Sequence, residues 1–324
     1  MRRSRALTLF GWFLTMLAVA TVTARSHAAD RMRLRIAASG ALAANPSEPL
    51  ELLPRTTNHD AALLESFLKP GTTHLEATGE ATGQAACPSE MVEVQGDYCP
   101  YLQQKCVRWL DPATGLQCAE FDKGATQTQC SMKSEHKRFC IDRYEWPNKL
   151  GALPRYMASW YDAKASCEAI GKRLCSDTEW TLACEGERRK PYPYGDGYER
   201  DPQACNIDKP YLWPHAELLF DPRTSSDELA RLDQREASGS RTACVSPYGV
   251  HDMVGNVDEW VVNVSQDGKP FVSGLKGGYW GPVRTRCRPM TTAHNETFRY
   301  YQIGFRCCGE ASSGPSSDAP VADR

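Results

Sequence analysis

Apolar residues that recur at the spacing of a helix face predict a short helix over residues 159–171. Ser159 stands where a helix N-cap is favoured, Asp162 follows three residues later, and Gly171 ends the run. The apolar positions that recur at the spacing of one helix face are Trp160, Ala163, Cys167 and Ile170. We therefore expect this helix to turn that face toward the interior.

A second helix is predicted over residues 176–186. Ser176 and Glu179 form the S-x-x-E pattern of a capping box, and Gly186 is a stop signal. Its inward face is formed by Trp180, Ala183 and Cys184. Each predicted helix thus carries one inward cysteine, and we expect disulfide bridges to start from both.

The remaining regular patterns are short. Residues 91–94 alternate as a half-buried strand does, and residues 139–144 have the composition of a second strand. The segment between them is rich in Gly, Pro and Cys, and residues 187–245 have mostly loop composition. The pattern therefore predicts few regular strands and long irregular connections.

The N-terminal residues 1–29 have the composition of an export signal. Arginines at positions 2, 3 and 5 precede an apolar run over residues 6–20, and small residues precede Arg25 and Asp30. Cleavage before either residue would give an exported protein, secreted or periplasmic. The alternative is an uncleaved anchor, because the run is almost long enough to span a bilayer. No later segment is apolar enough to cross a membrane.

Two further segments lack the composition of a folded domain. Residues 30–86 are rich in Ala, Thr, Ser, Gly and Glu, and residues 310–324 in Ser, Gly, Pro and Asp. We expect a disordered linker and a disordered tail. One folded domain then remains over residues 87–309, a size that a single core supports.

Composition and charge exclude nucleic acid as a partner. Hydrophobic residues make up 41% of the chain and charged residues 24%, as in ordinary globular proteins. The formal net charge is −2, and loss of the four arginines within residues 1–29 would change it to −6. A protein of this charge repels phosphate backbones.

All 14 cysteines lie between Cys87 and Cys308. An even number behind an export signal predicts a disulfide framework formed in an oxidising compartment. A zinc site is disfavoured because no C-x-x-C pair occurs. Cys205 and Cys244 flank one long insertion, and we expect them to pair. The adjacent Cys307 and Cys308 are expected to join different bridges, since neighbouring cysteines pair with strain.

Residues 246–260, SPYGVHDMVGNVDEW, combine backbone bends with oxygen donors. A tight bend exposes its own carbonyl groups, and carboxylates beside them provide the hard oxygen ligands that calcium prefers. The simpler alternative is a polar turn between two strands. The side-chain oxygen donors of the stretch are Asp252, Asn256, Asp258 and Glu259.

This stretch resembles the N-G-x-G-L-Y-D-M-x-G-N-V-W-E-W segment of formylglycine-generating enzymes, also called sulfatase-modifying factors. Further motifs, before and after this stretch, occur along the chain in the same order as in the family. CIDRYEWPN at residues 140–148 resembles F-x-I-D-x-Y-E-V-T-N, and residues 159–186 resemble S-W-x-D-A-x-A-Y-C-x-W-x-G-K-R-L-P-T-E-A-E-W-E-Y-A. KGGYW at residues 276–280 and IGFRC at residues 303–307 resemble R-G-G-S-W and the closing G-F-R.

The resemblance covers residues 87–309 and implies the fold and part of the covalent framework. The implied fold is α+β and C-type-lectin-like, with little regular secondary structure. The implied disulfide bridges join Cys167 to Cys307 and Cys184 to Cys287.

The resemblance also implies two calcium sites, each built from side-chain oxygens and backbone carbonyls. The first would use the side chains of Asn206 and Asp233 and the carbonyls of Ile207 and Arg235. The second would use the carboxylates of Asp252 and Glu259 and the carbonyls of Gly255 and Val257.

The chain departs from the family's oxidase at the copper ligands. That oxidase binds Cu(I) through two cysteines shortly after G-G-S, because Cu(I) prefers soft thiolates. The stretch after Gly278 is several residues shorter here, and Gly281 and Pro282 stand where the first cysteine would be. Cys287 matches a structural cysteine of the family, so copper is disfavoured. Asp258 also replaces the tryptophan of N-V-W-E-W.

Other catalytic patterns are weak. The seven histidines are scattered, and no G-x-S-x-G supports a serine nucleophile. The aromatic and Arg-rich run at residues 279–301 has two interpretations, a groove for a peptide or sugar, or core packing with salt bridges.

We therefore predict an exported, calcium-binding, disulfide-rich member of this family that binds a protein or glycan partner and lacks catalysis. One alternative is a copper-dependent oxidase that converts a sulfatase cysteine to formylglycine. Another alternative is a carbohydrate-binding lectin. Copper titration separates the oxidase from the other two, and glycan-array binding separates the lectin.

Overall fold

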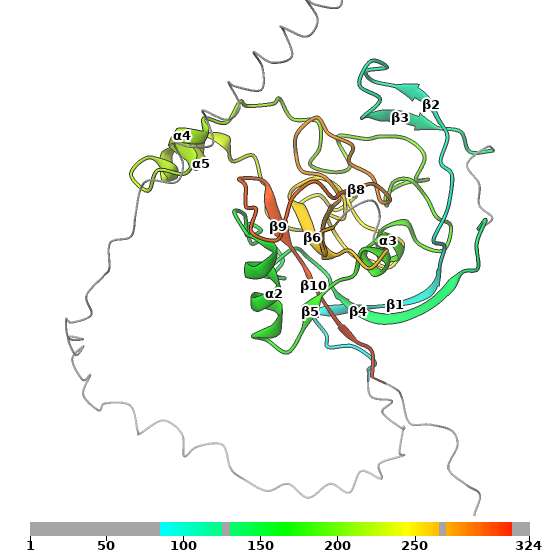
Figure 1. Ribbon diagram of the computed structural model, residues 1–324. Coiled ribbons are helices and arrows are strands. Elements are labelled where there is room, and N and C mark those ends of the chain that lie inside the picture. The colour runs from blue at the N-terminus through cyan, green and yellow to red at the C-terminus, as the bar shows by residue number, and fades with distance from the viewer. Residues whose placement is uncertain (1–84, 125–129, 266–269, 313–324) are drawn as a thin grey trace, which may run out of the picture. The chain divides into compact units, whose positions relative to one another are not determined.

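The computed structural model describes residues 85–124, 130–265 and 270–312 (Figure 1). The predicted export signal, nearly all of the predicted linker and most of the predicted tail lie outside the described residues. Within the described residues, no helix is long and apolar enough to cross a membrane. The described chain is α+β, with short strands, short helices and long connections between them.

The first sheet brings the start and the end of the domain together. Its strand order is β1-β4-β10-β5, and all its pairs are antiparallel. The predicted strands at residues 91–94 and 139–144 correspond to β1 and β4, which are longer because they pair along their whole length. The strands are β1 (Met91–Tyr98), β4 (Glu135–Asp142), β5 (Arg173–Leu174) and β10 (Cys307–Glu310).

The second sheet brings together residues from three of the motifs, those at residues 246–260, 276–280 and 303–307. Its strand order is β8-β7-β6-β9, with β6 and β9 parallel and the other pairs antiparallel. The D-E-W at the end of the 246–260 stretch begins β6, and Lys276 ends β7 just before the double glycine. The strands are β6 (Asp258–Val262), β7 (Ser273–Lys276), β8 (Met290–Thr291) and β9 (Ile303–Phe305).

Both predicted helices form, and both carry the expected caps. In α2 (Trp160–Glu168), Ser159 and Asp162 form a capping box, and in α3 (Asp177–Glu185), Ser176 and Glu179 form another. The inward face of α2 includes Cys167, but Ile170 lies beyond the helix and is about half exposed. The prediction for Ile170 is wrong because α2 ends before the face reaches that position.

The segments predicted as loop contain small additional elements. Between β1 and β4, a hairpin forms from β2 (Cys106–Trp109) and β3 (Cys118–Phe121). The insertion at residues 210–229 folds into α4 (Ala216–Leu219) and most of α5 (Ser225–Leu232), which lie together in Figure 1. Leu219 and Leu232 of this pair are fully buried against Val257, Trp280 and Tyr301.

Seven disulfides use all fourteen cysteines. The pairs Cys167–Cys307, Cys184–Cys287 and Cys205–Cys244 are the three that the sequence analysis names. Cys308 pairs with Cys175, so the adjacent cysteines of β10 join different bridges. Each bridge typically stabilises a fold by about 2–4 kcal/mol. The remaining pairs are Cys87–Cys140, Cys99–Cys130 and Cys106–Cys118.

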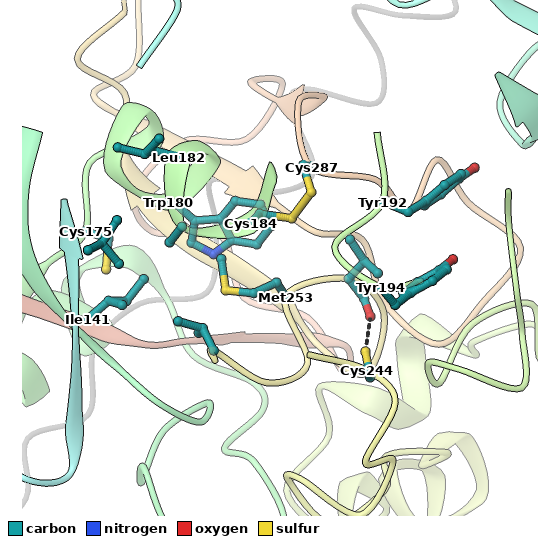
Figure 2. Packing of buried hydrophobic residues seen from close by; sticks show 14 of the residues in the cluster. Ile141, Cys175, Trp180, Leu182, Cys184, Tyr192, Tyr194, Cys244, Met253 and Cys287 are labelled. Carbon is teal, nitrogen blue, oxygen red and sulfur yellow. Dashed lines mark hydrogen bonds between the residues drawn. A yellow bond between two sulfur atoms is a disulfide. The ribbon is translucent and has the colours of Figure 1, made fainter. Parts of the chain in front are cut away.

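The largest buried cluster surrounds α3. Figure 2 shows Trp180 close to the Cys184–Cys287 bridge and to Met253, which comes from the 246–260 stretch. All four side chains are at most 1% exposed. The core therefore fixes the bend at residues 252–257 against α3 and against β6, the strand that follows the bend.

Candidate functional site

The bend in the 246–260 stretch is held by unusual backbone geometry. Asp252, Gly255 and Asn256 all have positive φ angles, between 54° and 81°. A side chain at Gly255 would place its Cβ only 2.3 Å from the carbonyl oxygen of Asn206. The backbone N–H of Asn256 donates to that same carbonyl at 3.0 Å. Glycine is therefore required at this contact, which joins the bend to the segment at Asn206.

Asp252 and Glu259, the two predicted carboxylate ligands, have different partners. Asp252 is buried and accepts a hydrogen bond from the backbone N–H of Gly239 at 2.7 Å. Glu259 is buried too, but its two oxygens accept from the guanidinium of Arg306, each at 2.7 Å. Trp180 donates a further hydrogen bond to it at 2.8 Å. The structure therefore places Glu259 in an ion pair, and we remove it from the calcium ligand set.

A third buried carboxylate, Glu145, lies in the same network. It accepts from Asn256 Nδ2 at 2.7 Å, from Ser238 Oγ at 2.9 Å and from the backbone N–H of Val257 at 3.1 Å. Sequence reasoning did not single it out, although it lies within the CIDRYEWPN motif. Its position in that motif, between two aromatic residues, was the signal that could have found it.

The network contains more carboxyl groups than cationic groups. In the described part of the chain, Glu259 is paired with Arg306, whereas neither Glu145 nor Asp252 forms a salt bridge. Burial raises the pKa of Glu145 well above its usual range, and the charges of Asp252 and Glu259 raise it further. Burial also raises the pKa of Asp252 to about 6. Two buried carboxylates without a cationic partner are what a divalent cation would stabilise.

The first predicted calcium set does not fit a cation. The carboxylate of Asp233 is bound by the guanidinium of Arg235, at 2.8 and 2.7 Å. The ammonium of Lys209 donates to the carbonyl of Gln234, which also accepts from Asn206. Asn206 Oδ1 is buried without a hydrogen-bond partner. The nearby carboxylate of Asp233, however, is already paired with Arg235, and the nearby Lys209 is positively charged. Asn206, Ile207, Asp233 and Arg235 therefore do not form the predicted cage.

The second predicted set is altered by the loss of Glu259, and calcium binding at the bend stays a prediction. In the described residues, no group of three or more His, Cys, Asp or Glu side chains is placed to hold a metal ion by itself. A cation bound at the bend would therefore also need carbonyl oxygens, and the predicted set names those of Gly255 and Val257. Together with Asp252 and Glu145, they would make an all-oxygen donor set, the kind that calcium prefers and a soft metal does not.

The stretch after the double glycine contains no thiol. Residues 279–286 carry no cysteine, and Cys287 is fully buried in its bridge to Cys184. Gly277 and Gly278 both have positive φ angles, and a Cβ on Gly277 would lie 2.9 Å from the carbonyl of Met253. The turn is therefore packed against the bend.

A cavity of about 480 Å³ lies beside this turn. Asp258 lines it, accepts from the backbone N–H of Gly278 at 3.2 Å, and has a pKa raised by burial to about 7. Arg284 also lines the cavity and lowers the pKa of that carboxyl through its charge. The replacement of tryptophan by Asp258 thus puts a polar group on the wall of this cavity.

The aromatic run at residues 279–301 is divided between the core and the wall of the cavity, and its use as a groove for a peptide or sugar stays a prediction. Tyr279, Trp280 and Tyr301 are buried and pack on one another in the core. His294 and Phe298 stack with their ring centroids 3.9 Å apart, and both line the cavity. The run therefore forms part of the core and part of a recessed aromatic surface.

Comparisons with known proteins agree with the motifs. A curated protein from Bos taurus, "Inactive C-alpha-formylglycine-generating enzyme 2", is 28% identical over 176 residues, which cover 50% of this chain and 52% of that protein. The protein of the same name from Mus musculus is 29% identical over 166 residues, covering 49% of this chain and 50% of that protein. The chain therefore spans about half the length of the curated relatives it matches.

Two solved structures match the chain at low sequence identity. PvdO from Pseudomonas aeruginosa is 17% identical with a TM-score of 0.42, and the match covers 72% of this chain and 100% of that one. CarF is 16% identical with a TM-score of 0.42, over 69% of this chain and 99% of that one.

The family itself is shown by a match to a family model. The model, described as "Sulfatase-modifying factor enzyme 1-like domain", matches residues 93–311, which is more than half of the chain. This range contains all the motifs of the resemblance, the bend at residues 252–257 and the cavity beside the double glycine. The chain belongs to the family of sulfatase-modifying factor enzyme 1-like domains.

Proposed function

We propose that this chain is an exported, calcium-binding member of the family that binds a protein or glycan partner and has no oxidase activity. The observation that carries the proposal is that all fourteen cysteines are paired in seven disulfides. A Cu(I) site needs free thiolates, and residues 279–286 offer none. Two curated relatives bear names that call them inactive.

Export is supported by the same disulfides. Bridges of this number form and persist in oxidising compartments, and they are rare where thiols are kept reduced. The apolar run behind three arginines supplies the corresponding signal.

The proposed partner site is the cavity beside the double glycine. Its wall combines aromatic rings, including Tyr300 and Phe298, with the polar groups of Asp258 and Arg284. A recessed surface of this composition suits a peptide side chain or a sugar ring, since both present apolar faces and hydrogen-bonding groups.

The experiment that tests the absence of copper chemistry is a Cu(I) titration of the oxidised protein. In competition with a Cu(I) chelator, we expect no copper to transfer to the protein. A control on the reduced, unfolded chain, in which the thiols are free, should take up copper. Stoichiometric, tight uptake by the oxidised protein would contradict the proposal.

The proposed calcium site predicts a ligand-dependent stability. A ligand that binds only the folded state raises the free energy of unfolding by about 2.7 kcal/mol at a hundredfold excess over its dissociation constant. We expect calcium to raise the melting temperature of the wild type and EDTA to reverse the change. The Asp252→Asn variant should lose this response, because it removes a carboxylate at the bend.

The matched control is Asp233→Asn, which removes a carboxylate of similar type from the set that does not fit. This variant should keep the full calcium response, because Asp233 is bound by Arg235. Equal melting temperatures of the wild type in calcium and in EDTA would show that the site at Asp252 is wrong. Loss of the response in Asp233→Asn alone would move calcium to the first set.

A further inference from the structure

A second and larger cavity, of about 770 Å³, shares no lining residue with the cavity beside the double glycine. It is bounded by the end of β1 and the residues after it, the start of β4, one face of α3, the residues that follow β6, and the segment from β7 to β8. Its walls are mixed, with aromatic, aliphatic, hydroxyl and charged groups. The lining residues that matter here are Tyr98, Asp177, Ser265, Lys276, Arg288 and Met290.

Lys276 is a buried lysine on the wall of this cavity. Its residue is only 2% exposed, and its Nζ lies 5.2 Å from the ring centre of Trp180. Nζ donates one hydrogen bond, to the backbone carbonyl of Arg288 at 2.8 Å. Within the described residues, Lys276 forms no salt bridge, although an ammonium carries three donors that need acceptors. These surroundings suit a neutral amine better than an ammonium ion.

The nearby carboxylates are committed to other groups. Glu185 is fully buried and binds the guanidinium of Arg288 through two hydrogen bonds, at 2.7 and 2.6 Å. Asp177 accepts from the backbone N–H of Val264 at 2.9 Å and from Ser265 Oγ at 2.5 Å. Neither carboxylate therefore lies in contact with Lys276.

Neighbouring charges both raise and lower the pKa of Lys276, and burial has the largest effect on it. Burial lowers the pKa of Lys276 to about 7, and the positive charges of Arg288 and Arg284 lower it too. The charges of Asp177 and Glu185 oppose this effect. At neutral pH, a large share of the side chain is thus present as the free amine, which is the nucleophilic form.

The identity of the residue matters as well. The R-G-G-S-W motif that this segment resembles has arginine at the position of Lys276. A guanidinium stays charged and does not act as a nucleophile, whereas a desolvated lysine amine does. The substitution therefore gives this chain a reactive group at a buried position that also faces a cavity.

We propose that Lys276 is a reactive amine that captures a small carbonyl compound, an aldehyde or an α-oxo acid, as a Schiff base in this cavity. The nitrogen lone pair attacks the carbonyl carbon and forms a C–N bond as the C=O π bond breaks, and a proton passes from nitrogen to the carbonyl oxygen. The resulting carbinolamine then loses water: its C–O bond breaks, the nitrogen lone pair forms the C=N bond of the imine, and the remaining N–H proton leaves with the hydroxyl group. No oxidant or reductant takes part, and water is the sole by-product.

The experiment uses glyoxylate or acetaldehyde as the probe, with cyanoborohydride to reduce the imine to a stable secondary amine. Peptide mapping by mass spectrometry then compares Lys276 with the exposed Lys149. At neutral pH, we expect Lys276 to be modified at least about tenfold faster, because ordinary lysines with a pKa of about 10.4 are almost entirely protonated. The two probes show whether the cavity selects for the carboxylate of an α-oxo acid.

The pH dependence supplies a second readout that needs no variant. The rate at Lys276 should rise with pH and level off above about 7. The rate at an exposed lysine should keep rising toward about 10. The Lys276→Arg variant should lose the adduct at this position, because a guanidinium is not nucleophilic. Reaction at Lys276 no faster than at Lys149, or a rate that follows the profile of an exposed lysine, would overturn the proposal.

Discussion

Replacing Arg306 with methionine is expected to lower the free energy of unfolding by about 3–5 kcal/mol, because it leaves a buried carboxylate without its cation. Arg306 and Glu259 are almost completely buried, with side-chain exposures of 0% and 1%. The guanidinium also donates to the carbonyls of Asp142 and His251, at 3.3 and 2.9 Å. Methionine has a similar length but provides none of these donors.

The free energy of unfolding lost in Arg306→Met should exceed that lost when an ordinary ion pair is broken, because other negative charges are close. Burial and the charge of Asp252 already raise the pKa of Glu145, and Arg306 is the cation that opposes this effect. Without Arg306, three carboxylates share a buried region that contains no compensating guanidinium. The native state must then take up protons or lose stability.

Two variants calibrate the measurement, which is urea unfolding in the presence of EDTA. Arg306→Lys keeps a positive charge but loses the two-pronged contact, so its loss should be smaller than that of Arg306→Met. Arg173→Met removes an ion pair with Glu179 at a site where the arginine side chain is 37% exposed. We expect that control to cost up to about 1 kcal/mol. Equal losses for Arg306→Met and Arg173→Met would contradict the assigned role of Arg306.

Local signals in the sequence determined the parts of the fold that were predicted well. The capping boxes at Ser159 and Ser176 act over three residues, so both helix starts are readable from the sequence. Ile170 was misplaced because the same periodicity continued past the point where α2 ends. The helices in the insertion were missed because their stability comes from packing Leu219 and Leu232 on distant aromatic residues.

The site was less predictable because its main contacts are long-range. Glu259 and Arg306 are 47 residues apart in the sequence, and Glu145 is more than 100 residues from both Asn256 and Val257. No local sequence pattern shows that Arg306 will pair with Glu259, the carboxylate that the family resemblance assigns to calcium. The absence of cysteine from residues 279–286 was predictable, because it is read directly from the sequence.

The largest functional effect we expect is the complete absence of oxidase turnover. Copper held by two thiolates is needed both to capture a substrate cysteine and to activate oxygen in such an oxidase, so losing the thiolates removes both steps. Residues 279–286 contain no cysteine, and Cys287 is bridged to Cys184. The aldehyde product should therefore be absent, and not merely reduced in amount.

The measurement that tests this central claim most directly is incubation of the purified, oxidised protein with Cu(I), oxygen and a C-x-P-x-R peptide. Mass spectrometry of the peptide should show unchanged cysteine, at the level of a control without protein. The same incubation after Cys184→Ser and Cys287→Ser should give the same result, because no second thiol becomes available in residues 279–286. Formylglycine above the control level from the wild-type protein would contradict the account.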